Sequence, residues 1–176
     1  MIFSESALAG AFVIDPERRG DERGYFARTF CAREFADHGL ATNFGQANTS
    51  LSAEAGTIRG LHFQRAPAEE AKLMRCIAGA MWDVIVDMRE GSPTYLKSFH
   101  TELTPENGRQ LYVPKGFAHG FQTLKPNTIA AYMVDEFYTP GVEEGLRYND
   151  PALGLDWPHE VTTVSEKDQS WPLISS

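Results

Sequence analysis

The stretch Gly56-Thr57-Ile58-Arg59-Gly60-Leu61-His62-Phe63-Gln64 has the residue pattern of a β-strand. In a strand, side chains two positions apart point to the same side. We therefore expect one face to carry Gly60, His62 and Gln64, and the other to carry Arg59, Leu61 and Phe63. His62 falls on a polar face, where it is either a hydrogen-bonded surface residue or a catalytic group.

Short apolar runs recur along the whole chain, with turn signals such as Glu90-Gly91-Ser92-Pro93 between them. The predicted strands are residues 11–15, 24–30, 44–52, 58–64, 72–77, 80–88, 97–103, 110–113, 118–124 and 128–137. Only residues 31–38 are predicted as a helix, because Phe30 and Phe35 are spaced to share one side. The Pro-rich stretch from Asp150 onward is predicted to be irregular. Many strands and few short helices predict an all-β sandwich or small barrel, with the jelly roll as the best match.

Length and composition set the class of protein. A chain of 176 residues with 42% hydrophobic content can bury a core without disulfides or metal, so we expect a single domain over residues 1–176. The net charge of −8, from 24 acidic and 16 basic residues, disfavours nucleic acid or an anionic membrane as a partner.

The cysteines and the N-terminal stretch bear on the compartment. Cys31 and Cys76 are the only cysteines and lie in apolar contexts, so we expect free thiols in a reducing cytoplasm. The apolar residues 7–14 are too few for a membrane span and follow no basic region. Neither a signal peptide nor a membrane span is therefore expected.

Two strand-like segments carry groups that could pair. His119 lies between glycine and apolar residues, and Asp83 shares a strand face with Asp87 in the apolar run 81–88. A buried carboxylate needs a partner, and pairing with Asp83 would fix the orientation and tautomer of the His119 ring. The alternatives are a purely structural His119 and solvent-exposed aspartates on an edge strand.

Lys72 and Tyr132 are polar groups in otherwise apolar strands. Lys72 alternates with Met74 and Cys76, so its ammonium group either lines a cavity or reaches solvent at the end of the strand. Tyr132 either takes part in chemistry or is a core aromatic whose hydroxyl finds a local partner. Neither residue identifies a function alone.

Metal and cofactor signatures are incomplete in the sequence. Jelly-roll oxygenases use a carboxylate with two histidines one residue apart, whereas His62 is followed by Phe63 and Gln64. The other histidines, His38, His100 and His159, lie in unrelated contexts. The sequence has neither a Gly-x-Gly-x-x-Gly after a strand nor a P-loop. We therefore expect a reaction that uses no metal and no cofactor.

Taken together, these segments resemble the dTDP-4-dehydrorhamnose 3,5-epimerase family, in order from Asp21 to Asp168. The matching pieces are DERGYF (21–26), QANTS (46–50), RGLH (59–62), Lys72, DVIVDMR (83–89), SPTY (92–95), PKGFAHGF (114–121), YTP (138–140) and NDP (149–151). The resemblance implies a cupin-like jelly roll that forms homodimers. It also implies that the N-terminal segment contributes to the neighbouring subunit's sheet and site, and that the C-terminal tail packs on the domain or on that partner.

The same resemblance implies roles in the inversion of stereocentres beside the ketone of a nucleotide-linked 4-keto sugar. His62 is the base that removes the proton, oriented by Asp168, and Tyr132 is the acid on the opposite face of the sugar. The intermediate is an enolate whose negative charge gathers on the C4 oxygen, so a donor held there stabilises the transition state. The groups implied for this stabilisation are Lys72, His119 and its partner Asp83.

Six further residues match positions that hold the nucleotide diphosphate and its sugar in the family: Arg23, Gln46, Asn48, Arg59, Glu143 and Lys167. Phe26, Arg28 and Tyr138 are also expected to bind the substrate. Arginine suits bidentate contact with phosphate oxygens, whereas Glu143 and Lys167 could equally be ordinary surface residues. Arg28 stands where the family pattern has glutamate, and Ala47 stands where it has aspartate. Another nucleotide, or another deoxy or heptose sugar, therefore stays open, as does inversion at C3, C5 or both.

The leading hypothesis is a cofactor-independent sugar-nucleotide 3,5-epimerase, which is an isomerase. Two alternatives come from other classes of protein. One is a non-catalytic jelly roll that binds a sugar nucleotide, and the other is a metal-dependent cupin oxygenase or isomerase.

Overall fold

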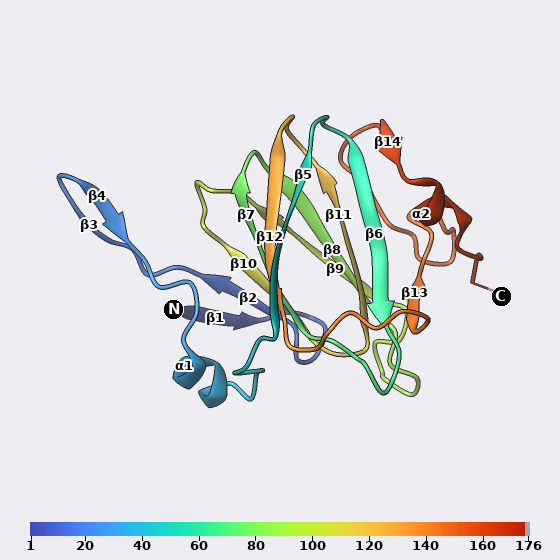
Figure 1. The fold of residues 1–176 in the computed structure, drawn as a ribbon, viewed down its shortest axis with the longest axis horizontal. Coiled ribbons are helices and arrows are strands. Elements are labelled where there is room, and N and C mark those ends of the chain that lie inside the picture. The colour runs from blue at the N-terminus through green and yellow to red at the C-terminus, as the bar shows by residue number, and fades with distance from the viewer. Residues whose placement is uncertain (175–176) are drawn as a thin grey trace.

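The protein folds into two β-sheets packed face to face, with a small hairpin outside them (Figure 1). The computed structural model describes residues 1–174. The strands of both large sheets pair antiparallel, apart from one parallel pair at the edge of the second sheet. The all-β prediction is confirmed.

The first sheet has six strands. In spatial order they are β1 (Ile2–Glu5), β2 (Phe12–Asp15), β10 (Gln110–Val113), β7 (Lys72–Ala78), β12 (Thr128–Val134) and β5 (Gln46–Ser52). The helix α1 (Ala32–Asp37) follows the N-terminal strands, and its Phe35 packs in an apolar cluster with residues of β2, β7 and β10.

The second sheet faces the first. Its strands, in spatial order, are β13 (Glu143–Gly145), β6 (Thr57–Gln64), β11 (Phe117–Thr123), β8 (Met81–Asp87) and β9 (Ser98–Leu103). The short strand β14 (Thr163–Val164) pairs in parallel with the start of β6, and the helix α2 (Glu166–Ser170) follows it.

Strand β8 shows why the sheets stay together. Its Met81 and Ile85 pack in the core between the sheets, while Val84 and Val86 pack on the outer face under residues such as Leu153. Apolar side chains on both faces are typical of a strand that is covered on both sides. β8 lies between β11 and β9, and its two aspartates are fully buried, so the alternative of exposed aspartates on an edge strand is wrong.

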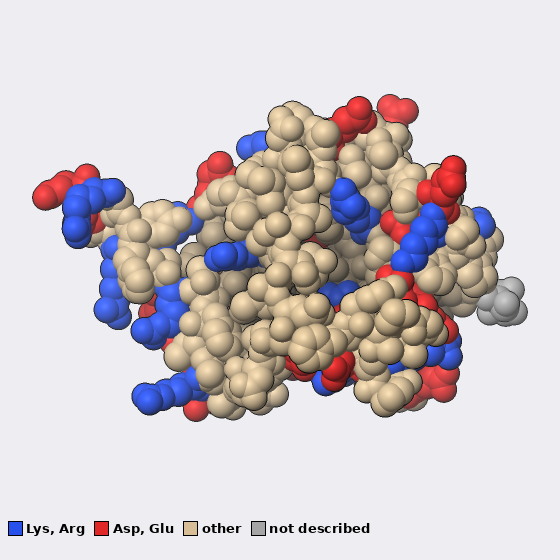
Figure 2. All heavy atoms as spheres, viewed as in Figure 1, with Lys and Arg blue, Asp and Glu red and all other residues tan. Residues whose placement is uncertain are grey.

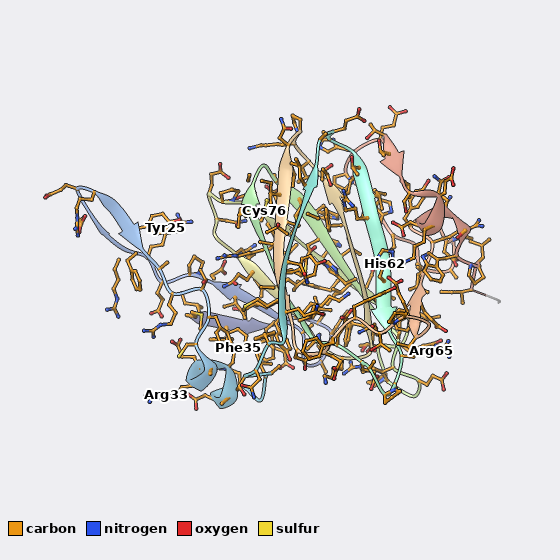
Figure 3. The ribbon with its side chains drawn as sticks, in the orientation of Figure 1. Tyr25, Arg33, Phe35, His62, Arg65 and Cys76 are labelled. Carbon is orange, nitrogen blue, oxygen red and sulfur yellow. The ribbon has the colours of Figure 1, made fainter. Side chains whose placement is uncertain are left out.

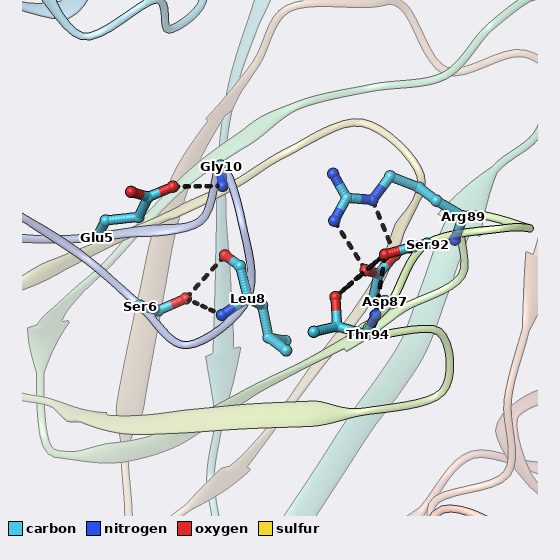
Figure 4. Close-up of polar contacts among 8 residues, drawn as sticks. All are labelled: Glu5, Ser6, Leu8, Gly10, Asp87, Arg89, Ser92 and Thr94. Atoms are coloured by element: carbon cyan, nitrogen blue, oxygen red, sulfur yellow. Dashed lines mark hydrogen bonds and ion pairs between the residues drawn. The ribbon is translucent and has the colours of Figure 1, made fainter.

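Buried Asp87 closes the turn between β8 and β9 (Figure 4). Its Oδ1 accepts a hydrogen bond from Nε of Arg89 at 2.8 Å, and its Oδ2 accepts from the hydroxyls of Ser92 at 2.7 Å and Thr94 at 2.6 Å. Burial alone would raise the pKa of Asp87, but these hydrogen bonds lower it well below its ordinary value. The ionised carboxylate therefore ties the turn to the sheet.

Most predicted strands and the predicted helix are present with boundaries shifted by a few residues. The strand predicted over residues 24–30 is shorter and ends at Phe26, and the one predicted over 128–137 ends at Val134. The prediction of an irregular tail is wrong at residues 163–170, which form β14 and α2. Strands β1, β3 and β13 were also missed, because such short segments are defined by the partners they pair with rather than by their own residue pattern.

The predicted alternation along β6 is wrong at one point. His62 pairs with His119 and Arg59 pairs with Phe121, so two residues of β6 lie opposite the single Gly120 of β11. The extra residue is a β-bulge, and it turns Arg59 to the side of the sheet that carries His62. A Cβ atom on Gly60 would lie 2.6 Å from Cα of Gly120, and the φ angle of Gly60 is +106°. Only glycine fits there.

The hairpin of β3 (Arg19–Asp21) and β4 (Gly24–Phe26) projects away from both sheets (Figure 1). All residues from 17 to 26 are exposed, including Tyr25 at 57% and Phe26 at 67%. Figure 3 places Tyr25 on this hairpin and His62 on β6, at separate places in the molecule.

The surface and the cysteines fit the composition. Acidic and basic side chains are interspersed over the face drawn in Figure 2, the projecting hairpin included. Cys31 and Cys76 are free thiols, as predicted. Among residues 1–174, no helix has the length and apolar character needed to cross a membrane.

Candidate active site

A cavity of about 470 Å³ opens between the two sheets. Arg59, His62 and His119 line it from the second sheet, and Lys72 and Tyr132 line it from the first. Segments far apart in the chain thus bring their polar groups to one place. The remaining lining residues are Ser50, Thr57, Ile58, Met74, Phe121, Thr163, Ser165, Lys167 and Asp168.

His62 is held by Asp168. Nε2 of His62 lies 2.5 Å from Oδ1 of Asp168, and Oδ2 of that carboxyl accepts from the backbone N–H of Gly60 at 3.2 Å. Asp168 sits in α2, whose first residue follows the N-cap Ser165, and the Ser165 hydroxyl accepts the backbone N–H of Asp168 at 3.1 Å. The cap fixes the short helix, and the helix fixes the carboxylate.

Asp168 is ionised, and this sets the tautomer of His62. Burial would raise the pKa of the Asp168 carboxyl, but hydrogen bonds from His62, Gly60 and Ser165 outweigh it and lower the pKa below its ordinary value. A carboxylate can only accept a hydrogen bond, so Nε2 of His62 carries the proton. Nδ1 is then the ring nitrogen that is able to take one from a substrate.

Lys72 is buried at the cavity wall, with 8% of its surface exposed. Its Nζ lies 2.9 Å from Oε1 of Glu70 and 3.4 Å from the backbone carbonyl oxygen of His62. The ammonium group therefore lines a cavity, as one of the two readings of the sequence predicted.

His119 and Asp83 form the predicted pair. Nε2 of His119 lies 2.8 Å from Oδ1 of Asp83, and both residues are buried. Oδ2 of Asp83 has no hydrogen-bond partner among residues 1–174. Of the two residues, His119 on β11 lines the cavity, and Asp83 on β8 lies behind it.

Tyr132 belongs to the other sheet. It lies on β12, opposite Asn48 of β5 and Met74 of β7. Burial raises the pKa of the Tyr132 phenol, and the negative charge of Glu70 raises it further, whereas Arg59 acts in the opposite sense. At neutral pH the phenol therefore keeps its proton and can give it up only to a strong base.

Six of the nine predicted substrate-binding residues line the main cavity or a smaller space beside it. Arg59 and Lys167 line the main cavity, where Nε of Arg59 donates to the Ser52 hydroxyl at 2.9 Å and Lys167 is paired with Glu143. A smaller space of about 150 Å³ adjoins the cavity, since His62, Lys72 and Tyr132 line both. Its walls include four more of the predicted residues: Gln46, Asn48, Tyr138 and Glu143.

Arg23, Phe26 and Arg28 lie outside both spaces. Arg23 and Phe26 are on the projecting hairpin, and Arg28 follows it and pairs with Glu34 at 3.1 Å. This protomer does not bring them to the cavity that His62 lines.

Two residues near the site were missed by reasoning from the sequence. Glu70 bonds Lys72, and its position two residues earlier, on the same side of an extended chain, is a signal that could have found it. Trp171 packs on Gly145, where a Cβ atom would lie 2.3 Å from the indole, and its ring lies edge-on to His62 with 6.5 Å between centroids. Asp168 itself was predicted, but the helix α2 that carries it was not. The signal that could have found this helix is the run Ser165-Glu166-Lys167-Asp168, which resembles a capping motif.

Within residues 1–174, no group of three or more His, Cys, Asp or Glu side chains is arranged to hold a metal ion. The expectation of a metal-free reaction stays a prediction.

The model of the dTDP-4-dehydrorhamnose 3,5-epimerase family matches residues 5–176. The chain belongs to this family. The dTDP-4-dehydrorhamnose 3,5-epimerase of Sinorhizobium fredii is 48% identical to it over 175 residues, which make up 99% of this chain and 90% of that protein. The predicted family and the predicted enzyme class, an isomerase acting as an epimerase, are confirmed.

Solved structures of dTDP-4-dehydrorhamnose 3,5-epimerases match the whole fold. The Bacillus anthracis enzyme with TDP and PPi bound is 44% identical, with a TM-score of 0.93 over 98% of this chain and 99% of that chain. The Legionella pneumophila dTDP-6-deoxy-D-glucose-3,5-epimerase in complex with dTDP-4-keto-L-rhamnose is 37% identical, with a TM-score of 0.91 over 98% and 92% of the two chains. The cupin-like jelly roll is confirmed, and the family favours catalysis over the non-catalytic alternative.

Proposed function

We propose that this epimerase inverts C3 and C5 of a dTDP-linked 4-keto-6-deoxy sugar, giving the dTDP-4-dehydrorhamnose type of product. The observation that carries the proposal is that His62, bonded to an ionised Asp168, and Tyr132 line one cavity from opposite sheets. The relative that is 48% identical carries the name dTDP-4-dehydrorhamnose 3,5-epimerase, which supports this reaction.

The reaction needs a base and an acid on opposite faces of the sugar. Nδ1 of His62 takes the proton from the carbon beside the ketone, and the electron pair of the broken C–H bond moves through the carbonyl to the C4 oxygen. Tyr132 then gives its phenolic proton to the opposite face of that carbon, and the carbonyl reforms. Before the second carbon reacts, His62 loses the proton it took to solvent, and the Tyr132 phenolate takes one from solvent. Inversion follows because removal and return occur on different sides.

The enolate must be stabilised between these two steps. Lys72 and His119 line the same cavity as the base and the acid, and a donor aimed at the C4 oxygen lowers the barrier more than it lowers the ground state. General acid–base groups contribute about 10²- to 10⁴-fold in rate. Positioning and charge stabilisation must therefore supply much of the remaining acceleration.

The nucleotide diphosphate lies, in this proposal, toward Arg59 and Lys167, which bring positive charge to the cavity rim. The relative from B. anthracis binds TDP and pyrophosphate, which supports dTDP as the carrier. Arg28 and Ala47 depart from the family pattern, so the base of the nucleotide needs a direct test. A series of nucleotides is titrated, and the one that raises the unfolding temperature most identifies the base.

Catalysis is tested by incubating the protein with the 4-keto-6-deoxy sugar nucleotide in deuterated water and following C3 and C5 by NMR. We expect solvent deuterium at both carbons and the appearance of the rhamno product. Ligand binding with no deuterium at either carbon would instead support the non-catalytic sugar-binding alternative.

We further propose that the chain, as a single domain, forms a homodimer in which each hairpin of β3 and β4 enters the partner's site. Support comes from the exposure of the whole hairpin and from the position of Arg23, Phe26 and Arg28 outside the cavity of their own protomer. A cytoplasmic location is part of the same proposal and is supported by the two free thiols.

Mixed subunits test the exchange of the hairpin. The variants His62→Ala and Arg23→Ala are each expected to be nearly inactive alone. In a mixed dimer, the subunit with an intact His62 receives an intact Arg23 from its partner, so one of its two sites is complete. When equal amounts of the two variants are unfolded and refolded together, about half of the dimers are mixed, and about a quarter of all sites should regain activity. A mixture with no more activity than its components means that the hairpin serves its own protomer.

A further inference from the structure

Glu70 is a half-buried carboxylate beside the proposed reacting groups, and the proposed mechanism gives it no role. It lies two residues before Lys72, and the side chains of both are largely shielded, with 13% and 10% exposed. It lines the smaller space together with His62, Lys72 and Tyr132. A shielded carboxylate needs a charged or hydrogen-bonding partner, and that of Glu70 is the ammonium group of Lys72.

The two oxygens of Glu70 are held by different partners. Oε1 lies 2.9 Å from Nζ of Lys72, and Oε2 accepts from Nε2 of Gln64 at 3.3 Å. Gln64 is itself held in place: its Nε2, which has two hydrogens to share, also lies 3.0 Å from the backbone carbonyl oxygen of Ala68 and 3.2 Å from that of Phe137, and its Oε1 accepts from the N–H of Thr139. Each oxygen of the carboxylate thus has a protein partner within hydrogen-bond distance, which favours this position of the side chain.

Lys72 has three donors, and the fold accounts for two of them. One points to Glu70 and one to the backbone carbonyl oxygen of His62 at 3.4 Å. Within residues 1–174 these are the contacts of Nζ, so the third donor is available to a ligand in the cavity that Lys72 lines. A lysine stem is flexible, so the direction of this third donor depends on the two fixed partners.

We propose that Glu70 is a positioning residue of the epimerisation, holding the Lys72 ammonium toward the C4 oxygen and keeping a negative charge beside the Tyr132 phenol. The proposal rests on the proposed function for its effect on rate. Its effect on the phenol does not depend on which substrate the protein uses.

The electrostatic half of the proposal has a defined sign. Burial raises the pKa of Tyr132 most, and Glu70 adds to that increase, so removal of the Glu70 charge lowers the pKa and ionises the phenol at lower pH. The other charged or titratable groups that line the same two spaces are His62, His119, Arg59, Tyr138, Glu143, Lys167, Asp168 and Lys72. All of them remain in a Glu70 variant.

Three variants separate the effect of Glu70 on the position of Lys72 from the effect of its negative charge. Glu70→Ala removes both oxygens, Glu70→Gln keeps an acceptor for Lys72 without the charge, and Glu69→Gln makes the same charge change at a neighbour that lines neither space. A misplaced catalytic group costs up to about 10²-fold in rate. We expect kcat to fall by at least about tenfold in Glu70→Ala with KM little changed, to recover partly in Glu70→Gln, and to keep its wild-type value in Glu69→Gln.

The phenol is followed separately by phenolate absorbance against pH. The Tyr132 signal is the difference between each protein and the same protein with Tyr132→Phe. We expect its midpoint, and the alkaline limb of kcat, to move to lower pH in Glu70→Gln and to stay in place in Glu69→Gln.

An unchanged Tyr132 midpoint in Glu70→Gln overturns the proposal, and so does an unchanged kcat in Glu70→Ala. If Glu70→Ala does not fold, the midpoint in Glu70→Gln decides alone. If the wild-type protein epimerises no substrate, the proposed function fails, yet the absorbance titration still decides whether Glu70 acts on Tyr132.

Discussion

Nε2 of His62 lies 2.5 Å from Oδ1 of Asp168, a residue 106 positions later in the chain. The proposed base on β6 and its orienting carboxylate on α2 thus meet only in the folded protein. The contact places one ring nitrogen against a carboxylate and leaves the other for the proton transfer that we propose.

Asp168→Asn is expected to lower kcat by about 10²- to 10⁴-fold, because the amide does not stabilise the imidazolium that forms when His62 takes a proton. The rate of deuterium uptake at C3 and C5 measures this loss. Affinity for dTDP should change little, and Glu166→Gln, an exposed charge change on the same helix, serves as the control. A fall of less than about threefold would remove Asp168 from the mechanism.

Tyr132→Phe is expected to separate proton exchange from inversion. His62 still removes a proton and can return a deuteron to the same face, so the recovered substrate should carry deuterium while product formation falls by about 10²- to 10⁴-fold. NMR of the recovered sugar nucleotide measures both. Tyr95→Phe, at an exposed tyrosine that lines neither of the two spaces around the site, is the matched control. Wild-type product formation in Tyr132→Phe would assign the acid to another group.

Gly60→Ala is expected to destabilise the protein by about 3 kcal/mol or more, because the new Cβ meets the backbone of β11 at 2.6 Å and the φ angle of +106° is strained for alanine. Urea unfolding at neutral pH measures the change. Gly91→Ala is the control, since Gly91 has a φ angle of +79° and no heavy atom within 4 Å of the added Cβ. Its cost should be about 1 kcal/mol. Equal losses in the two variants would mean that the contact with β11 is unimportant.

Asp87→Asn is expected to lower the free energy of unfolding by about 3 kcal/mol at pH 7, because it breaks a buried, charge-assisted network. The folded-state pKa of Asp87 lies below its ordinary value of 3.8, so its contribution is fully present above about pH 4. It is lost as the pH falls below 3.8 toward the folded-state pKa. Urea midpoints for the two proteins should therefore converge in acid, and a constant difference between pH 7 and pH 2 would contradict the assignment.

The residue pattern was sufficient for the long strands. In β8 and β11, the apolar runs predicted a strand in each case and placed Asp83 and His119 on those strands. Both strands are buried on both faces. The residue pattern did not predict some of the short strands, which exist only because they pair with a neighbouring strand. Strand β13, with the sequence Glu143-Glu144-Gly145, has no strand signature of its own and is defined by its register with β6.

Strict alternation along β6 also failed, and the reason is local. The bulge at Gly60 turns Arg59 toward the cavity, and a glycine inside a strand is the signal that could have indicated it. The polar groups of the cavity were predicted one by one, but their assembly across two sheets depends on non-local packing. Glu70 was missed because its partner, Lys72, was considered without its neighbours.

Met74 and Phe121 line the cavity and also belong to the core between the sheets. Stacked sheets are spaced by the side chains between them, at roughly 10 Å. The size of these two side chains therefore sets the gap that the imidazole and the phenol must span. A larger or smaller residue at either position should shift the two reacting groups and lower the turnover rate, in addition to the stability that it costs the core, which makes the apolar filling a determinant of rate as well as of stability.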